Sequence, residues 1–195
     1  MKTKTSGTAA INPDERYTCK EYKSWPESER WELIEGLAYA MSPAPTRSHQ
    51  KFVVDLVGKL YAFLQGKPCE LLVSPIDVFL PASPDEAEDE VDTIVQPDVI
   101  VVCDRDKLID KGVRGGPDFV VEILSPSTAM KDLSKKKSLY AKHGVREYWI
   151  VNPEDLSVLA YRLEGGAFGR VREYRGGEDV DSSVLEGFSW KAGVW

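Results

Sequence analysis

Residues 119–124 read Phe-Val-Val-Glu-Ile-Leu and residues 147–151 read Glu-Tyr-Trp-Ile-Val, two runs that are apolar except for one glutamate each. Such runs are typical of strands that are covered on both faces of a sheet. Between them, residues 125–128 (Ser-Pro-Ser-Thr) end the first strand and cap a helix, which we expect to reach about His143 before Gly144 stops it. A strand, a helix and a second buried strand in this order predict an α/β fold.

Upstream of this unit the sequence predicts a hairpin and a long helix. Residues 31–41 are two short strand candidates around Glu35-Gly36. Thr46 is the expected N-cap of a helix through about Leu64, whose apolar stripe includes Phe52, Val53, Leu56, Val57, Leu60, Phe63 and Leu64.

The remaining segments complete one expected domain, residues 1–195. Strands are predicted over residues 70–80 and 98–102, and a hairpin about Gly165-Gly166 within residues 157–174. We find no internal repeat and no linker. The expected appendages are a flexible arm at 1–12, an acidic loop at 82–92, and a C-terminal hairpin and tail at 157–195, in which Trp190 and Trp195 pack down.

Composition excludes several classes of protein. With 195 residues, 42% of them hydrophobic, the chain has enough apolar material for a sizeable core, so disorder is not its dominant state. No apolar run is long enough to span a membrane, and the N-terminal residues do not resemble a secretory signal. Three widely spaced cysteines, Cys19, Cys69 and Cys103, indicate neither a disulfide framework nor a zinc knuckle. A soluble protein of the reducing cytoplasm is expected.

Charge is distributed unevenly along the chain. The formal net charge is -7, but the acidic loop alone contributes six acids and no base: Asp85, Glu86, Glu88, Asp89, Glu90 and Asp92. The charged residues of the segment 131–146 are mostly basic, with six Lys or Arg and only Asp132 as an acid. This segment could form a positive surface or simply the solvated face of a helix.

Asp98 and Glu122 are ionisable residues within otherwise apolar strand candidates. An unpaired buried carboxylate costs several kcal/mol, so each is expected to have a cationic partner, a metal or a proton. If the two strands are neighbours, both carboxylates can converge on one face. The alternative for either residue is a strand end, exposed or paired with an arginine.

Asp77 is a third lone acid, within the strand candidate at 70–80. Three carboxylates on successive strands suggest a hard-cation site, for which magnesium is suited because it prefers oxygen ligands. On the following helix Asp132, Lys136 and Tyr140 share one face, so Lys136 could approach the carboxylates. The alternative is that Lys136 is one surface lysine among three in a row.

Several short motifs occur together in one order: Gln96-Pro97-Asp98, the run Val121–Ser127 around Glu122, and Asp132-x3-Lys136-x3-Tyr140-x3-Gly144-Val145-x-Glu147-Tyr148-Trp149. Upstream are Glu32–Gly36, Met41-Ser42-Pro43, His49 and Ser74-Pro75-x-Asp77-Val78. This set resembles the Uma-two-type family of restriction-endonuclease-like proteins, within the PD-(D/E)XK nuclease superfamily. The resemblance covers roughly residues 31–153.

The resemblance implies a restriction-endonuclease-like α/β fold, a mixed central sheet flanked by helices. It makes Asp98 and Glu122 the two metal-binding carboxylates. The lysine expected two residues after Glu122 is Leu124 here, and the resemblance implies that Lys136 on the next helix replaces it. It also places Glu35, His49 and Asp77 in the same cleft as catalytic candidates.

Two hypotheses of function follow. The first is a metal-dependent endonuclease of the PD-(D/E)XK type that hydrolyses DNA with Mg²⁺, or with Mn²⁺ as the alternative, and that forms a homodimer. Asp98 and Glu122 would hold the metal, and Lys136 would orient water or stabilise charge on the phosphate. The second is a catalytically inactive nucleic-acid-binding or protein-interaction module on the same fold, which the negative net charge favours.

Overall fold

The computed structural model describes residues 11–194 except 27, 42–44 and 126–130, and for residues 131–133 it describes the backbone alone. Residues 1–10 of the arm expected at 1–12, and Trp195, lie outside the described residues. The helices are α1 (Cys19–Tyr22), α2 (Arg47–Leu64), η1 (Glu88–Glu90), η2 (Arg105–Lys107), η3 (Lys131–Lys136) and α3 (Lys137–Lys142). The strands are β1 (Trp31–Ile34), β2 (Leu37–Ala40), β3 (Glu70–Val73), β4 (Asp77–Phe79), β5 (Ile94–Val95), β6 (Val99–Val102), β7 (Leu108–Ile109), β8 (Gly112–Arg114), β9 (Phe119–Ile123), β10 (Glu147–Asn152), β11 (Ser157–Glu164), β12 (Ala167–Phe168), β13 (Arg172–Tyr174), β14 (Asp179–Asp181) and β15 (Ser189–Lys191).

The larger sheet has the order β12-β11-β10-β9-β6-β3, with β13 also paired to β11. Strands β9 and β10 are parallel, and η3 and α3 form the connection between them. The other pairs in this sheet are antiparallel. The sheet is therefore mixed, and the predicted α/β class is confirmed.

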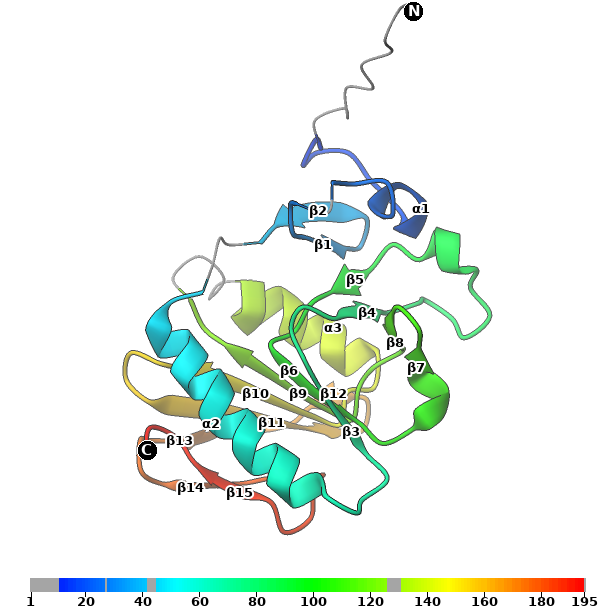
Figure 1. The fold of residues 1–195 in the computed structure, drawn as a ribbon. Coiled ribbons are helices and arrows are strands. Elements are labelled where there is room, and N and C mark those ends of the chain that lie inside the picture. Colours follow the sequence, from blue (N-terminus) through cyan, green and yellow to red (C-terminus); the bar gives the residue numbers. More distant parts are fainter. Residues whose placement is uncertain (1–10, 27, 42–44, 126–130, 195) are drawn as a thin grey trace, which may run out of the picture.

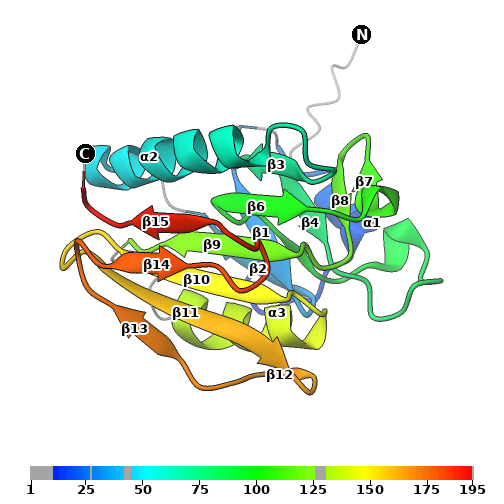
Figure 2. The ribbon, with the colours of Figure 1, turned by 90° about the horizontal axis from the view of Figure 1, so that it is seen from below.

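Apolar layers cover both faces of this sheet (Figure 1). Helix α2 packs on one face together with the β14–β15 hairpin, which contributes the buried Trp190. Figure 2 looks onto that face. Helix α3 packs on the opposite face, through Leu139 and Tyr140. Because both faces are covered, β6, β9 and β10 are apolar at nearly every position, as the sequence indicated.

The smaller sheet has the order β2-β1-β5-β4-β8-β7 and packs through Ile34, Val78 and Val113 onto the α3 side of the larger sheet. Its first two strands form the predicted hairpin. Glu35 (φ 50°) and Gly36 (φ 81°) make the two-residue turn, in which both residues have the left-handed backbone that such turns require.

The structure confirms the long helix and corrects one strand. Thr46 caps α2, since its Oγ1 accepts a hydrogen bond from the His49 backbone N–H at 3.2 Å. The single strand expected over residues 70–80 is wrong: β3 belongs to the larger sheet and β4 to the smaller one. The break falls at Ser74-Pro75, where a proline has no N–H to continue a strand ladder.

The cysteine spacing indicated no disulfide framework, but the structure contains a disulfide. Cys69 and Cys103 form a disulfide, with their Cα atoms 3.9 Å apart. Cys69 precedes β3 and Cys103 follows β6, and the register pairs their neighbours Glu70 and Val102. The antiparallel pairing thus brings two cysteines together that are 34 residues apart in sequence. Cysteine usage therefore gives no support for a reducing compartment.

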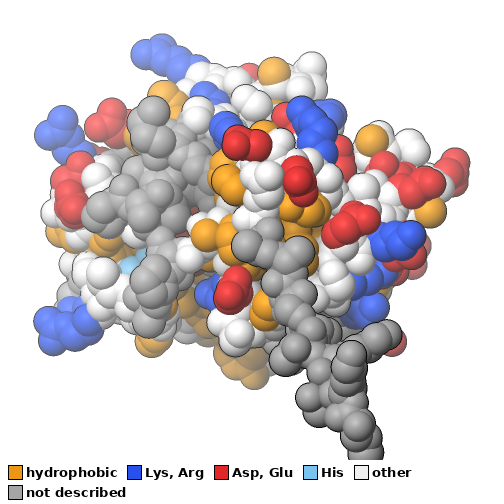
Figure 3. All heavy atoms as spheres, turned by 90° about the horizontal axis from the view of Figure 1, so that it is seen from above, with side chains coloured by type: hydrophobic (Ala, Val, Ile, Leu, Met, Phe, Trp, Pro, Cys, Tyr) orange, Lys and Arg blue, Asp and Glu red, His pale blue; other side chains and the backbone are white. Residues whose placement is uncertain are grey.

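The acidic loop is partly neutralised by lysines. Lys23 lies 2.6 Å from a Glu88 carboxylate oxygen and 2.7 Å from one of Asp89, and these contacts lower the pKa of both carboxyl groups. Lys111 lies 3.9 Å from Glu88. Figure 3, which looks onto the side of the β1–β2 hairpin, shows acidic and basic side chains mixed along the edge formed by this loop. The loop is therefore less negative than its sequence suggests.

None of the helices in the described ranges is both long and apolar enough to cross a membrane.

Glu147, at the start of β10, ties the C-terminal segment to the larger sheet. Its buried carboxylate accepts from Trp149 Nε1 at 2.7 Å through Oε1. Its Oε2 accepts from the Ser182 hydroxyl (2.8 Å), from the Ser183 backbone and hydroxyl (2.8 and 3.0 Å) and from the Val184 backbone (2.9 Å). One carboxylate thus holds the turn that leads from β14 toward β15.

We expect Glu147→Gln to lower the free energy of unfolding by about 3 kcal/mol. Both oxygens of Glu147 accept hydrogen bonds, whereas the amide NH₂ of glutamine can only donate. It must therefore face either the Trp149 N–H or the donors of residues 182–184, and the donors that it faces lose their acceptor. Urea denaturation followed by tryptophan fluorescence measures the change. Glu186→Gln, at an exposed position in the same segment, is the control and should stay within about 0.5 kcal/mol of wild type. Equal stability of both variants would contradict the assignment.

Candidate active site

Asp98 and Glu122 lie on one face of neighbouring strands. Strands β6 and β9 are antiparallel, and Val99 pairs with Val121, so Asp98 lies beside Glu122. Ile100, two residues after Asp98, and Val120, two residues before Glu122, lie on the same face as the carboxylates and belong to the apolar cluster that packs under α3. Glu122 is buried, whereas the Asp98 side chain is 20% exposed. The expected convergence of the two carboxyl-bearing strands is confirmed.

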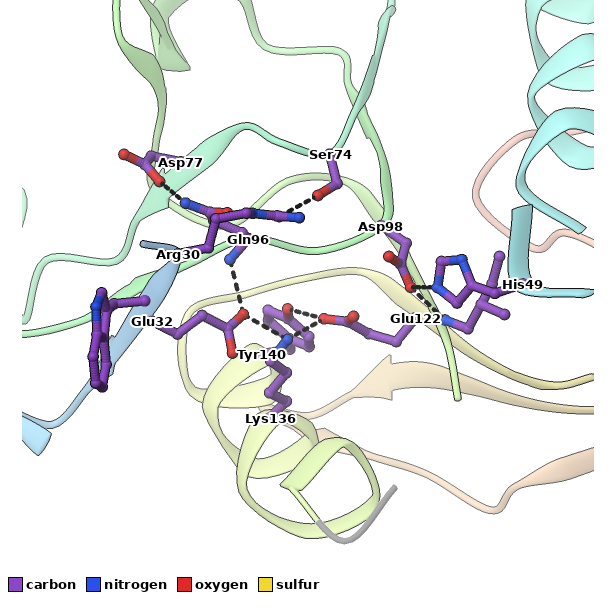
Figure 4. Close-up of polar contacts among 12 residues, drawn as sticks. Arg30, Glu32, His49, Ser74, Asp77, Gln96, Asp98, Glu122, Lys136 and Tyr140 are labelled. Atoms are coloured by element: carbon purple, nitrogen blue, oxygen red, sulfur yellow. Dashed lines mark hydrogen bonds and ion pairs between the residues drawn. The ribbon is translucent and has the colours of Figure 1, made fainter. Parts of the chain in front are cut away.

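The buried Lys136 ammonium lies between two carboxylates (Figure 4). Its Nζ is 2.8 Å from Oε1 of Glu122 and 2.7 Å from Oε1 of Glu32, and all three side chains are at most 5% exposed. The Tyr140 hydroxyl also donates to Oε1 of Glu122, at 2.7 Å. Two carboxylates around one ammonium offset most of the cost of burying these charges.

Neighbouring side chains on the helix point elsewhere. The Lys135 ammonium bonds to the Tyr39 hydroxyl and lies 4.7 Å from the centre of that ring. The Lys137 ammonium lies 4.2 Å from the centre of the Tyr161 ring. Of these three lysines, only Lys136 reaches the carboxylates, as the helical stripe predicted. Asp132, the first member of that stripe, has a side chain outside the described residues.

Glu32 is a member of the cluster that sequence reasoning missed. It lies on β1, is fully buried, and accepts a hydrogen bond from the Gln96 backbone N–H at 2.9 Å. A signal was available, because Glu32 is a lone acid in a short apolar strand, as Glu122 is. The cationic partner of Glu32, however, is Lys136, which comes from a helix distant in sequence that no local pattern indicates.

His49 is also brought to this centre. On the first turn of α2, its Nε2 lies 3.1 Å from Oδ2 of Asp98. The same oxygen accepts from the Ile123 backbone N–H at 2.8 Å. His49 Nδ1 is buried without a hydrogen-bond partner in the part of the chain that the structure describes. Asp98 is therefore fixed from both sides through a single carboxylate oxygen.

Asp77 belongs to a hydrogen-bond network that Gln96 links to the cluster. Its Oδ1 accepts from Gln96 Nε2 at 2.8 Å and from the Tyr22 hydroxyl at 3.0 Å. Arg30 donates to Gln96 Oε1 from Nε (3.1 Å) and Nη2 (2.7 Å). Burial is the largest cause that raises the pKa of Asp77, and burial together with Asp77 raises the pKa of Tyr22. The network orients Gln96, whose backbone binds Glu32.

Glu35 is not part of the cluster. It lies exposed at the β1–β2 turn, where its backbone carbonyl accepts from Arg16, and its side chain lines a separate cavity with Tyr39 and Lys135. The expectation that Glu35 lines the same cleft as the carboxylates is therefore corrected.

Oxygen chemistry at this centre fits a hard divalent cation. Among the described residues nothing donates to Oδ1 of Asp98, since the contacts of this carboxylate use Oδ2. The described residues contain no group of three or more His, Cys, Asp or Glu side chains arranged to hold a metal ion. The three-carboxylate site expected with Asp77 is thus not formed. Asp98 and Glu122 alone would suffice for Mg²⁺, which usually keeps several waters.

Known proteins with a similar sequence or a similar fold were found. Residues 19–193 match the sequence model of the Uma2 family, whose description is "Putative restriction endonuclease". An uncharacterized protein, slr1290, from Synechocystis sp. is 26% identical over 173 residues, which cover 87% of this chain and 86% of that protein.

A crystal structure from Anabaena variabilis, entitled a "putative nuclease belonging to DUF820", has a similar fold. It superposes with a TM-score of 0.70 at 19% sequence identity, over 89% of this chain and 94% of that one. At this identity the likeness concerns the fold, and it confirms the expected α/β architecture.

The raised pKa of Asp77 predicts a specific effect of pH on stability. Between the ordinary value of 3.8 and the raised value, the native state holds more protons than the unfolded chain, so the free energy of unfolding falls as pH rises. Asp77→Asn keeps an oxygen acceptor for Gln96 and Tyr22 but carries no charge. We expect the variant to gain stability relative to wild type as pH increases from 3 to 7, measured by urea denaturation across that range.

The exposed Asp110→Asn is the matched control, which should follow the wild-type curve over the whole pH range. An Asp77→Asn curve parallel to that of wild type would show that the raised pKa of Asp77 is not linked to folding.

Proposed function

Because the chain belongs to the Uma2 family of restriction-endonuclease-like proteins, we propose that it is a metal-dependent endonuclease that hydrolyses phosphodiester bonds of DNA. The observation that supports this best is the buried Lys136 beside Glu122, one strand from Asp98. A cation and two carboxylates at one place match the needs of phosphoryl transfer, in which negative charge develops on the phosphate oxygens.

Asp98 and Glu122 are the residues that would hold the divalent cation, through Oδ1 of Asp98 and a carboxylate oxygen of Glu122. When bound there, Mg²⁺ or Mn²⁺ would neutralise charge on the scissile phosphate and lower the pKa of a coordinated water. Without it, the carboxylates of Glu32, Asp98 and Glu122 would repel DNA. The cation thus serves binding as well as rate.

Lys136 is the proposed catalytic cation. In hydrolysis the water oxygen forms a new bond to phosphorus, the bond from phosphorus to the leaving oxygen breaks, and that oxygen takes up a proton. The ammonium, held by Glu32 and Glu122, stabilises the charge that grows on the phosphate and orients the attacking water. Glu32 and Tyr140 act as positioning residues for Lys136 and Glu122.

His49 is proposed to act through Asp98 rather than on the substrate. Its Nε2 shares Oδ2 of Asp98 with the Ile123 N–H, which leaves Oδ1 without a donor among the described residues. Asp77 supports the centre more indirectly, through Gln96. The homodimer expected from the family resemblance stays a prediction.

The proposal predicts cleavage of supercoiled plasmid with Mg²⁺ or Mn²⁺ and none with EDTA. Under single-turnover conditions, and at a temperature at which circular dichroism shows the variant to be folded, Lys136→Ala should lower the rate by about 10² or more with little loss of DNA affinity, because the lysine acts mainly at the transition state. Lys135→Ala and Lys137→Ala are matched controls on the same helix and should mainly weaken salt-sensitive binding.

Cleavage by Lys136→Ala at the wild-type rate, with Lys135→Ala or Lys137→Ala inactive, would contradict the assignment of the catalytic lysine. Uncut plasmid with every metal would favour the inactive binding module instead.

Metal binding is predicted to depend on the two carboxylates. Isothermal titration calorimetry should show Mg²⁺ or Mn²⁺ binding to wild type and its loss in Glu122→Ala. Asp77→Asn is the control, because Asp77 bonds to Gln96 and Tyr22 rather than to the cluster, and it should bind as wild type does. Equal binding by wild type and Glu122→Ala would refute the metal site.

A further inference from the structure

A cavity of about 380 Å³ lies between the β1–β2 hairpin and the helical segment formed by η3 and α3. Figure 1 shows the two elements that enclose it, with the hairpin above the helix. Its volume falls within the range of small-molecule sites. The lining residues are Ile34, Glu35, Leu37, Tyr39, Ser134, Lys135, Ser138, Leu139 and Lys142.

The β1–β2 hairpin and η3 contribute residues both to the cavity and to the carboxylate cluster. In the β1–β2 ladder Tyr39 pairs directly with Glu32, so the tyrosine lies beside the carboxylate that holds Lys136. On the helix, Lys135 of the cavity is the chain neighbour of Lys136. A DNA strand with its scissile phosphate at Lys136 would therefore have its adjacent nucleotide at this cavity.

The lining has an apolar floor and a charged rim. Ile34 and Leu139 are buried, and Leu37 is half-buried beside them. Lys135 and Lys142 are exposed at the rim and outnumber its one acid, Glu35. Tyr39 holds Lys135 through its hydroxyl and its ring face, so this ammonium is already oriented. Such a cavity can hold a flat ring against its apolar residues and a negatively charged group beside its two lysines.

We propose that this cavity binds one unpaired nucleotide of the DNA substrate, next to the scissile phosphate. The inference rests on the proposed function. The base lies on the floor of Ile34, Leu37 and Leu139, and the phosphate beside it meets Lys135 and Lys142. In a matched duplex the bases are stacked and cannot enter, so the preferred substrate class is DNA with unpaired nucleotides: single strands, frayed ends or extrahelical bases.

The test compares four oligonucleotides of one sequence by fluorescence anisotropy in Ca²⁺, which reports binding without relying on turnover. They are a single strand, a matched duplex, a duplex with one extra unpaired 2-aminopurine, and the same duplex with an abasic site at that position. Wild type should bind the single strand and the unpaired 2-aminopurine duplex about 10-fold tighter than the matched duplex. The abasic duplex should bind like the matched one, and 2-aminopurine fluorescence should change on binding.

Ser138→Trp tests the cavity itself. Ser138 is exposed on α3, so a tryptophan there can fill the cavity without disturbing the core. We expect this variant to lose the 10-fold preference while it still binds matched duplex. Lys142→Ala should weaken binding of the unpaired substrates more than binding of duplex. Lys137→Ala removes the same charge on the Tyr161 side of the helix and should leave the preference intact.

The outcomes separate this inference from the proposed function. Equal affinity of wild type for the matched, abasic and 2-aminopurine duplexes would overturn the inference, even if plasmid is cleaved, and that comparison needs no variant. A preference that Ser138→Trp and Lys142→Ala both retain would also overturn it. A protein that binds none of these oligonucleotides and leaves plasmid uncut would overturn the proposed function together with the inference.

Discussion

A lysine ammonium buried between two carboxylates is the interaction on which the centre of this protein depends. Lys136 bonds to Glu32 and to Glu122, and each of the three side chains is at most 5% exposed. Each charge taken alone would cost several kcal/mol to bury, so each requires the others. The positions of three chain segments are thereby coupled through one nitrogen atom.

The same contact joins the two sheets. Glu122 comes from the larger sheet, Glu32 from the smaller one, and Lys136 from the connection that makes β9 and β10 parallel. Gln96 extends the coupling, because its backbone binds Glu32 and its side chain binds Asp77. Hydrophobic contacts through Ile34, Val78 and Val113 also join the two sheets, and the polar contacts help to fix how one sheet is oriented on the other.

Local patterns were sufficient to predict most of the strands of the larger sheet, although not where β3 ends. Asp98 and Glu122 were recognisable because a carboxylate in an apolar strand must be compensated, and Lys136 because helical spacing places it on the Tyr140 face. The hairpin at Glu35-Gly36 and the helix from Thr46 to Leu64 also follow from local turn and capping chemistry.

What sequence could not supply were contacts that arise only from tertiary packing. Glu32 could not be preferred over Glu35, because the choice depends on which face of the hairpin meets α3. The Cys69–Cys103 disulfide depends on the register of β3 against β6. The division of residues 70–80 between two sheets needed more than the apolar pattern, because Pro75 marks a break without saying where the chain goes next.

The burial of Lys136 has a consequence for how such a chain can change over evolutionary time. Replacing the lysine by a neutral residue would leave Glu32 and Glu122 buried beside each other without a cation, and a lineage with that change would bear a folding defect before any loss of chemistry mattered. Purifying selection for a folded chain alone would therefore keep Glu32, Glu122 and Lys136 together. In this architecture stability would retain the three residues of the proposed active site, so drift toward an inactive descendant would start at exposed positions outside the cluster, such as Lys142 or Ser138.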